Sequence, residues 1–282
     1  MDELRKLERL REIVRGYGSA VVAFSGGVDS ALVLRVAVDE LGEGALAVTG
    51  LSPSVPEWDL EDAARLARDL GARYRLLRTE ELTEPRYVAN GPDRCYWCKA
   101  ELFDKLEALR VEEGLAVIVD GTNLDDHGDW RPGLEARRER AIRSPLCEAE
   151  MTKGDVRAAS RRLGLPTAEK PAAACLASRF PYGTEVTAEG VERVGAAEAR
   201  VRALGFRQVR VRHHGDVARL EIDPGEMERL LDPACRDAVV RGVREAGYRY
   251  VALDLDGYRT GSLNEVLPAR IDRGRVDGDQ RR

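Results

Sequence analysis

Apolar runs and helix-like stripes alternate along the first half of this chain. Short apolar runs, several rich in β-branched residues, predict strands at residues 19–24, 45–49, 74–77 and 115–119. The segments between them have helical composition or apolar residues at helical spacing, which predicts helices over 29–41, 57–70 and 99–112. Strands and helices in alternation are typical of a parallel sheet covered by helices on both faces. We therefore expect an α/β fold.

The pattern changes beyond a proline- and alanine-rich stretch between Pro166 and Pro181. A helix is expected first, over 188–204. Two polar/apolar alternating segments follow, at 208–212 and 218–222, and Gly215-Asp216 between them predicts a hairpin turn. A helix over 226–246 and a strand over 249–254 come last. This order predicts a small α+β domain.

These patterns predict two domains and a tail. The α/β domain is expected over residues 1–178 and the second domain over 179–268. Residues 269–282 contain almost no apolar side chains and are expected to be a disordered tail.

Composition narrows the class of protein. Hydrophobic residues make up 43% of the 282 residues and charged residues 34%, as in a soluble globular protein. No apolar run approaches the ~20 residues that cross a bilayer, and the charged N-terminus is unlike a signal peptide. We expect a cytoplasmic protein without a membrane partner. A net charge of −5 with 5% aromatic residues argues against a nucleic-acid partner.

One loop carries the clearest chemical signal. It lies between a predicted strand and a predicted helix and reads Ser25-Gly26-Gly27-Val28-Asp29-Ser30. Its glycines let the backbone approach an anion, the helix start offers N–H groups, and Ser25 and Ser30 add hydroxyl donors. Asp29 fits such a cradle if a divalent cation such as Mg²⁺ lies between its carboxylate and a phosphate. An ordinary serine-glycine turn is the alternative, but the flanking strand and helix favour phosphate binding.

Other polar residues also follow predicted strands. Ser52 follows one strand, and Gly121-Thr122-Asn123 follow another. Because ligands of parallel sheets bind beyond the carboxyl ends of the strands, we expect these residues to meet the loop in one crevice. Asp125 and Asp126 come next, where they would face Mg²⁺ or ribose, or cap the following helix.

The cysteines do not read as a disulfide framework, because five is an odd number and the chain looks intracellular. Cys95 and Cys98 form a C-x-x-C pair, and Cys175 stands alone. Half of a structural zinc site is one alternative, although no fourth ligand is evident. Cys147 lies in an apolar setting typical of a core residue, and we assign no role to Cys235.

Several segments together resemble one family. The loop resembles the PP-loop of ATP pyrophosphatases, which split ATP between its α- and β-phosphates. Residues 94–99, 121–133 and 170–179 narrow this to the LarE family, the ATP-dependent sulfur transferases of nickel-pincer nucleotide synthesis. The resemblance runs from about Leu4 to Pro268. It includes Ser52-Pro53-Ser54 and the stretch from Gly205 to Arg212.

The resemblance implies a fold, a reaction and partners. The fold would be the PP-loop, adenine nucleotide alpha hydrolase-like sheet with a small C-terminal domain. ATP would adenylate the carboxylates of pyridinium-3,5-biscarboxylic acid mononucleotide, and sulfur would displace AMP to give thiocarboxylates. A homo-oligomer is also implied. The implied ATP-binding residues are Ser25, Gly26, Gly27, Asp29, Ser30, Ser52, Gly121, Thr122 and Asn123, with Asp29 and Asp125 as magnesium ligands and Asp29 and Ser30 as catalytic residues.

Two sulfur sources occur in the family. In one kind of member, the cysteine matching Cys175 gives up its own sulfur and becomes dehydroalanine. In the other, three cysteines hold a [4Fe–4S] cluster whose fourth iron carries sulfide from an external donor. Because Cys95 and Cys98 accompany Cys175 here, and three thiolates leave one cubane corner open, we favour the cluster. Incidental Cys95 and Cys98 beside a sacrificial Cys175 are the alternative.

Substrate-binding candidates lie beside these cysteines and in the second domain. Arg210 and Arg212 project from one strand face, which suits a phosphate, although a solvated face is the alternative. Trp97 would stack on an aromatic ring. The resemblance adds Ser178, Arg179 and Glu198. His213 and His214 are expected in a surface turn.

Three other functions are alternatives. A tRNA thiolase with a three-cysteine cluster is disfavoured by the acidic net charge. An amidating synthetase would leave the cysteines without a role. An ATP-binding iron–sulfur sensor would bind ATP without turnover.

Overall fold

The computed structural model describes residues 3–128, 132–171, 173–259 and 261–266, and within these ranges the chain forms two compact units. The first unit holds the described parts of residues 1–81 and 95–173, and the second holds 82–94 and the described residues from Ala174 on. The chain thus passes to the second unit after Glu81 and returns at Cys95. This division differs from the one predicted at residue 178, and the predicted tail over 269–282 lies outside the described residues.

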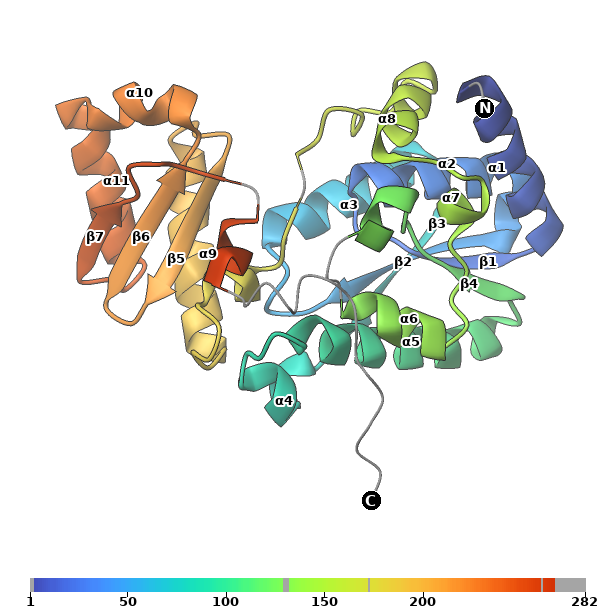
Figure 1. The fold of residues 1–282 in the computed structure, drawn as a ribbon, viewed down its shortest axis with the longest axis horizontal. Coiled ribbons are helices and arrows are strands. Elements are labelled where there is room, and N and C mark those ends of the chain that lie inside the picture. The colour runs from blue at the N-terminus through green and yellow to red at the C-terminus, as the bar shows by residue number, and fades with distance from the viewer. Residues whose placement is uncertain (1–2, 129–131, 172, 260, 267–282) are drawn as a thin grey trace. The chain divides into compact units, whose positions relative to one another are not determined.

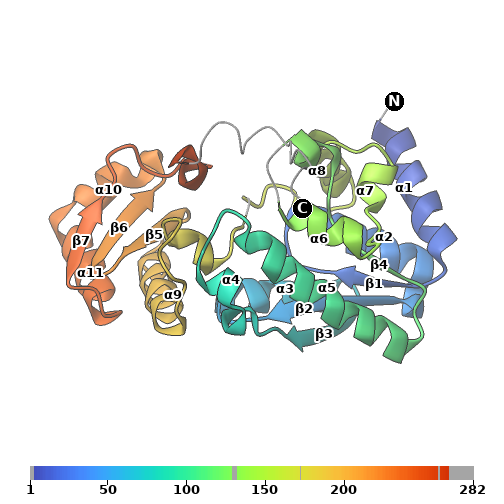
Figure 2. The same ribbon diagram turned by 60° about the horizontal axis from the view of Figure 1, so that its bottom comes forward.

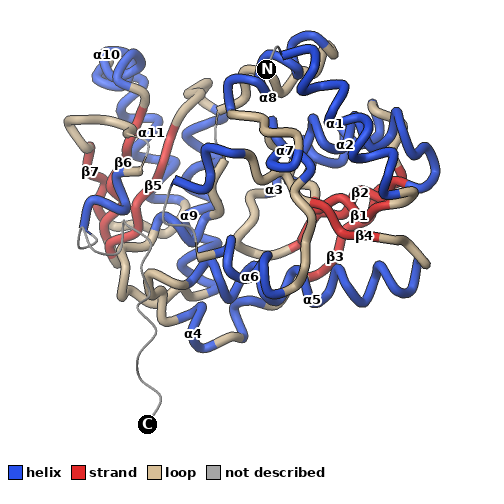
Figure 3. Tube along the Cα trace, turned by 45° about the vertical axis from the view of Figure 1, so that its right-hand side comes forward, coloured by secondary structure: helices blue, strands red, loops and turns tan. Residues whose placement is uncertain are grey.

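Four strands form a parallel sheet in the described part of the first unit. They are β1 (Ala20–Ala23), β2 (Ala45–Leu51), β3 (Arg73–Arg78) and β4 (Val117–Val119). Their order is β3-β2-β1-β4, and Figure 3 shows them as neighbouring strands between layers of helix. The predicted α/β class and its parallel sheet are confirmed.

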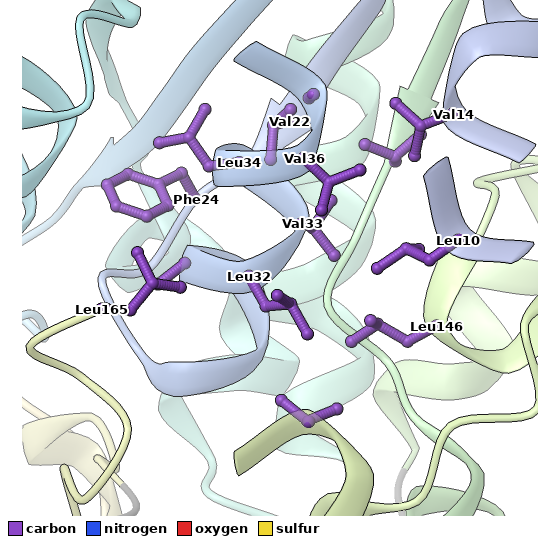
Figure 4. Close-up of a cluster of buried hydrophobic side chains, with 14 of the residues drawn as sticks. Leu10, Val14, Val22, Phe24, Leu32, Val33, Leu34, Val36, Leu146 and Leu165 are labelled. Carbon is purple, nitrogen blue, oxygen red and sulfur yellow. The ribbon is translucent and has the colours of Figure 1, made fainter. Parts of the chain in front are cut away.

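Helices cover both faces of this sheet (Figure 1). They are α1 (Glu3–Tyr17), α2 (Val28–Leu41), α3 (Glu57–Asp69), α5 (Arg94–Glu113), α6 (Gly133–Glu139), α7 (Pro145–Glu148) and α8 (Lys153–Arg162). Strand side chains alternate between faces, so neighbouring residues of β1 enter different cores. Val22 joins the core of α1, α2, α3, α7 and α8, part of which Figure 4 shows. Val21 joins the core of α5 and α6.

The strand order places a switch point beside β1. From β1 the chain moves to β2 and then to β3 at one edge, and it returns to β4 on the opposite side of β1. The loops that leave the carboxyl ends of β1 and β4 therefore run in opposite directions and leave a crevice between them. The loop at residues 25–30 follows β1, so it lies at this switch point.

The second unit is built on a mixed sheet, in which the described residues form three strands, β5 (Val209–His214), β6 (Val217–Ile222) and β7 (Tyr250–Leu253). β5 and β6 pair antiparallel through the turn at Gly215-Asp216, and β7 pairs parallel with β6. Figure 2 shows this sheet with its helices. The helices are α4 (Pro85–Val88), α9 (Ala188–Ala203), α10 (Met227–Leu231) and α11 (Pro233–Glu245).

Short 3-10 helices complete the described chain. They lie at Gly42–Gly44, Glu81–Thr83, Leu124–Gly128, Leu176–Arg179, Pro224–Glu226 and Ser262–Val266. Among the described residues, no helix is both long and apolar enough to cross a membrane.

Three sequence expectations differ from the structure. The helix expected over 226–246 is divided into α10 and α11, because Asp232 is extended before Pro233 and its carboxylate caps α11 by accepting the Cys235 N–H at 3.0 Å. The helix expected from 99 begins at Arg94. The histidines expected in a turn end β5, and His213 Nδ1 lies 2.9 Å from the Tyr248 hydroxyl.

Candidate active site

The loop at residues 25–30 has the shape of an anion cradle. Gly26 has φ +69°, a left-handed conformation that favours glycine, and an added Cβ would lie 3.1 Å from that of Ala63 on α3. Ser25 and Ser30 brace the loop, with their Oγ atoms 3.1 Å apart and the Ser25 N–H donating to Ser30 Oγ at 3.2 Å. Gly27 is the N-cap of α2. The first turn of α2 therefore presents N–H groups and its positive dipole end where a phosphate would bind.

The segment after β4 packs directly on that first turn. A Cβ on Gly121 would lie 2.8 Å from the Ser30 backbone nitrogen, so this position admits only glycine. Asn123 Nδ2 donates to Asp29 Oδ1 at 3.1 Å. Thr122 instead donates hydrogen bonds to the Asp120 carboxylate, from its N–H at 3.1 Å and from its hydroxyl at 2.6 Å. The structure thus brings Gly121 and Asn123 to the loop, as the predicted crevice requires.

Ser52 lies at the end of the neighbouring strand, β2. Its hydroxyl donates to the Glu81 carboxylate and accepts the Ser54 N–H at 2.9 Å. Ser52, Ser54 and Glu81 are all buried. Sequence reasoning missed Glu81, because a single glutamate in a polar stretch carries no motif that would distinguish it.

Asp125 contacts the start of α8. Its Oδ2 accepts the Lys153 backbone N–H at 2.8 Å, so this carboxylate contacts the first turn of α8, whose N-cap is Thr152. Lys153 also places its ammonium against Asp29 Oδ2. Sequence reasoning missed Lys153. The available signal was the capping box Thr152-x-x-Asp155, which marks Lys153 as the first residue of a helix.

Cys95 and Cys98 both lie near the start of α5. Residues three apart share a helix face, so their side chains project to the same side. Cys95 is exposed and Cys98 is half-buried. Trp97, between them, contacts Tyr96 edge-to-face with ring centroids 4.7 Å apart. The predicted pair is therefore two neighbouring thiols, of which one is exposed and one is half-buried.

Cys147, predicted to be a core residue, is only half-buried and belongs to neither core cluster of the described residues. Its Sγ donates to the Thr122 carbonyl oxygen at 3.1 Å. Burial, with smaller effects of Asp120 and Asp126, raises the pKa of this thiol to about 11. The thiol is therefore protonated at neutral pH, which makes it a poor nucleophile and a poor metal ligand.

In the second unit, Cys175 begins a tightly held turn. It is the N-cap of the 3-10 helix Leu176–Arg179 and is partly exposed. Its carbonyl oxygen accepts the Ser178 hydroxyl at 2.7 Å and Arg179 Nη1 at 3.0 Å. Arg212 Nη1 donates to the Ser178 carbonyl oxygen at 2.8 Å. The backbone around this thiol is thus fixed by residues predicted to bind substrate.

These arginines form a buried charge cluster with two glutamates. Arg179 pairs with Glu198 through Nε at 2.8 Å and Nη2 at 2.9 Å, and Arg212 pairs with Glu221 at 2.9 and 2.6 Å. Burial lowers the pKa of Arg210, and the charge of Arg179 lowers it further. Because Arg210 and Arg212 are buried, the alternative of a solvated face is wrong. The cluster carries more guanidinium groups than carboxylates.

Replacing Glu198 with glutamine is expected to destabilise the protein by about 3–5 kcal/mol. The side chains of Arg179 and Glu198 are 2% and 1% exposed, so the variant leaves a buried guanidinium without its counter-charge. Glu198 also accepts the Val211 N–H at 2.9 Å. Urea denaturation measures the loss. Asp237→Asn, on an exposed pair of the same unit, is the control and should change stability by less than about 1 kcal/mol. An equally small loss for Glu198→Gln would contradict the prediction.

Metal ligands are not gathered in the structure as described. Among its described residues, no group of three or more histidine, cysteine, aspartate or glutamate side chains is placed to hold a metal ion. The predicted cysteine ligands belong to both units, with Cys95 and Cys98 in the first and Cys175 in the second.

The similarity of this chain to known proteins extends beyond the loop at residues 25–30. The model of the NAD synthase family matches residues 5–86, which include β1, the loop and α2. A protein of Synechocystis described as uncharacterized is 46% identical over 262 residues, covering 93% of this chain and 98% of that protein. The pyridinium-3,5-bisthiocarboxylic acid mononucleotide synthase of Lactiplantibacillus plantarum is 40% identical over 247 residues, covering 87% and 89% of the two chains.

The second of these relatives decides the family. Its similarity extends over 247 residues and therefore over parts of both units, whereas the NAD synthase model ends at residue 86. The chain therefore belongs to the LarE family of PP-loop, ATP-dependent sulfur transferases.

Proposed function

We propose that this enzyme adenylates the carboxylates of pyridinium-3,5-biscarboxylic acid mononucleotide and converts them to thiocarboxylates for nickel-pincer nucleotide synthesis. The observation that carries the proposal is the loop at residues 25–30, assembled with Gly121 and Asn123 at the switch point of the sheet, in a chain 40% identical to a synthase of the bisthiocarboxylated product.

The first step activates a poor electrophile. A carboxylate oxygen of the substrate attacks the α-phosphorus of ATP, and the bond from that phosphorus to the bridging oxygen breaks. The bonding pair leaves with pyrophosphate, so no proton transfer is needed. The N–H groups of the loop and of the first turn of α2 stabilise the charge that gathers on the leaving group.

For Mg²⁺ we propose a site at Asp29 and Asp125. Asp29 and Asp125 offer carboxylate oxygens, which are the ligands this ion prefers. Bound there, Mg²⁺ would neutralise charge on the phosphates. Asn123 and Lys153 hold the Asp29 carboxylate in place, through Nδ2 at 3.1 Å and through the ammonium respectively.

The second step introduces sulfur. A sulfur nucleophile attacks the acyl carbon of the adenylate, and the bond to the AMP oxygen breaks with its electron pair on AMP. With sulfide as nucleophile the product is the thiocarboxylate. With the Cys175 thiolate it is a thioester, which yields thiocarboxylate when the Cα proton is lost and the Cβ–S bond breaks, leaving dehydroalanine.

For the sulfur source we propose a [4Fe–4S] cluster on the thiolates of Cys95, Cys98 and Cys175. The donor set fits, because these ligands are all cysteines and Cys95 and Cys98 share one helix face, on which Cys95 is exposed. When bound, such a cluster would supply sulfide from its fourth iron. The alternative is that Cys175 alone gives up its sulfur.

For substrate binding we propose the buried cluster of Arg179, Arg210, Arg212 and Glu198 with Ser178, and Trp97 beside the cysteines. The excess of guanidinium groups over carboxylates favours an anion, and the substrate is a mononucleotide. Homo-oligomerisation and cytoplasmic location stay predictions.

Pyrophosphate release tests the reaction. Purified protein is incubated with ATP and Mg²⁺, with and without the pyridinium dicarboxylate mononucleotide. Release that requires this substrate is expected. Release that requires tRNA instead, or ATP binding without any release, would contradict the proposal and favour a thiolase or a sensor.

Anaerobic purification tests the cluster. A brown protein with about four irons per chain is expected, and Cys95→Ser should lose the colour. Cys235→Ser is the matched control and should keep it. Colourless, iron-free protein whose Cys175 becomes dehydroalanine during turnover, detected by mass spectrometry, would establish the sacrificial alternative.

A further inference from the structure

The loop at residues 25–30 contains no cation of its own. A Walker-type loop carries a lysine after its last glycine, which reaches the phosphates of the nucleotide. Here Val28 follows the last glycine, and Asp29 adds a negative charge. A polyphosphate with several negative charges therefore needs positive side chains from other parts of the fold.

Lys153 supplies one positive charge at the end of the loop. It is the first residue of α8, and its ammonium contacts Asp29 Oδ2. Its backbone is fixed by the capping box and by the hydrogen bond from its N–H to Asp125 at 2.8 Å. The side chain is 35% exposed, so it is accessible to a ligand. An ammonium has three N–H donors, and Asp29 does not use them all.

Lys170 supplies a second charge near the start of the loop. Its Nζ donates to the Gly26 carbonyl oxygen at 3.3 Å and lies 3.4 Å from Asp62 Oδ2. Arg157 of α8 fixes the backbone here by donating to the carbonyl oxygens of Ala168 and Lys170, the latter at 3.1 Å. Lys153 is thus positioned by the capping box and by Asp125, and Lys170 is positioned by Arg157 of α8.

The composition of the chain makes these lysines informative. Of its 45 basic residues, 40 are arginines and five are lysines. The lysines are Lys6, Lys99, Lys105, Lys153 and Lys170. Although the chain uses arginine at nearly every basic position, both basic side chains that contact the loop within the described residues are lysines. An arginine beside Asp29 would use the planar fork of its guanidinium group in a bidentate pair with that carboxylate. A compact lysine ammonium can contact the carboxylate and still donate to a phosphate.

We propose that Lys153 and Lys170 bind the phosphates of ATP and stabilise pyrophosphate as it leaves, in place of the lysine that the loop lacks. The inference rests on the proposed function, in which ATP is cleaved between its α- and β-phosphates. It adds two residues that touch the nucleotide, neither of which lies in the loop.

Measurements of nucleotide affinity distinguish phosphate binding by these two lysines from a purely structural role. Lys153→Met and Lys170→Met keep the apolar stem and remove the charge. Each should weaken the binding of ATP and of inorganic pyrophosphate roughly 10- to 100-fold by calorimetry, and change AMP binding much less. Lys105→Met is the control, because Lys105 pairs with Glu101 and Glu80 on α5 and near β3. It should bind ATP as the unchanged protein does.

Two results would overturn the proposal. One is ATP and pyrophosphate affinity in both lysine variants equal to that of Lys105→Met. The other is an equal loss of ATP and AMP affinity together with lowered thermal stability, which would indicate a structural role. Binding is measured without the pyridinium substrate, so it judges the lysines even if the unchanged protein releases no pyrophosphate with that substrate and the proposed function fails.

Discussion

Replacing Asp29 with asparagine is expected to lower the rate of pyrophosphate release by at least about 100-fold. Asparagine keeps the size of the side chain and a carbonyl oxygen for Asn123, but it removes the charge. The ammonium of Lys153 then loses its partner at the loop, and the oxygen donors for Mg²⁺ are weakened. Single-turnover release of pyrophosphate with the dicarboxylate substrate measures the effect.

A matched control for this prediction lies on the same helix. Asp39, near the end of α2, pairs with Arg35 at 3.0 Å, and Asp39→Asn should release pyrophosphate at the unchanged rate. Iron content should be the same in both variants. Unimpaired release by Asp29→Asn would contradict the prediction. Loss of both release and iron would show that the loop and the cysteines are not separate sites.

Replacing Cys175 with serine is expected to abolish thiocarboxylate formation while pyrophosphate release persists. Both proposed sulfur sources require this thiol, one as a cluster ligand and the other as the donor itself. In the proposed reaction, adenylation depends on the loop at residues 25–30, which lies in the other unit. Mass spectrometry of the product and a pyrophosphate assay on the same reaction separate the two steps.

Two further cysteine variants complete this experiment. Cys235→Ser, on α11, should form thiocarboxylate at the unchanged rate. Cys95→Ser distinguishes the two sources, because it should lose the reaction if a cluster delivers sulfur and keep one turnover if Cys175 is sacrificial. Thiocarboxylate formed by Cys175→Ser at the unchanged rate would exclude both sources.

The features that sequence reasoning recovered are local ones. The runs at residues 19–24 and 45–49 became β1 and β2, because a buried parallel strand reads as a continuous apolar segment. The loop at residues 25–30 was evident because its function requires a short contiguous motif. Its meeting with Asn123 followed from a general rule about parallel sheets.

The features that sequence reasoning missed depend on contacts between residues that lie far apart in the sequence. Lys153 reaches Asp29 across 124 positions, and nothing in the local pattern marks that pair. The segment 82–94 belongs to the second unit through bonds such as that from Arg94 Nη1 to the Ala177 carbonyl oxygen at 2.9 Å. The start of α5 was missed because tryptophan and cysteine near it have low helix propensity.

Residues 82–94 belong to the second unit although the chain before and after them belongs to the first, and this affects how such a protein can be divided or recombined. Asn90 Nδ2 donates to the carbonyl oxygens of Pro181 at 2.8 Å and Thr184 at 2.9 Å, so this segment supports the turn that follows Cys175. A gene fragment that begins at Ala174 omits that support. The second unit is therefore not a cassette that a single breakpoint transfers. An exchange between relatives keeps it whole only if breakpoints near Glu81, Cys95 and Ala174 move together.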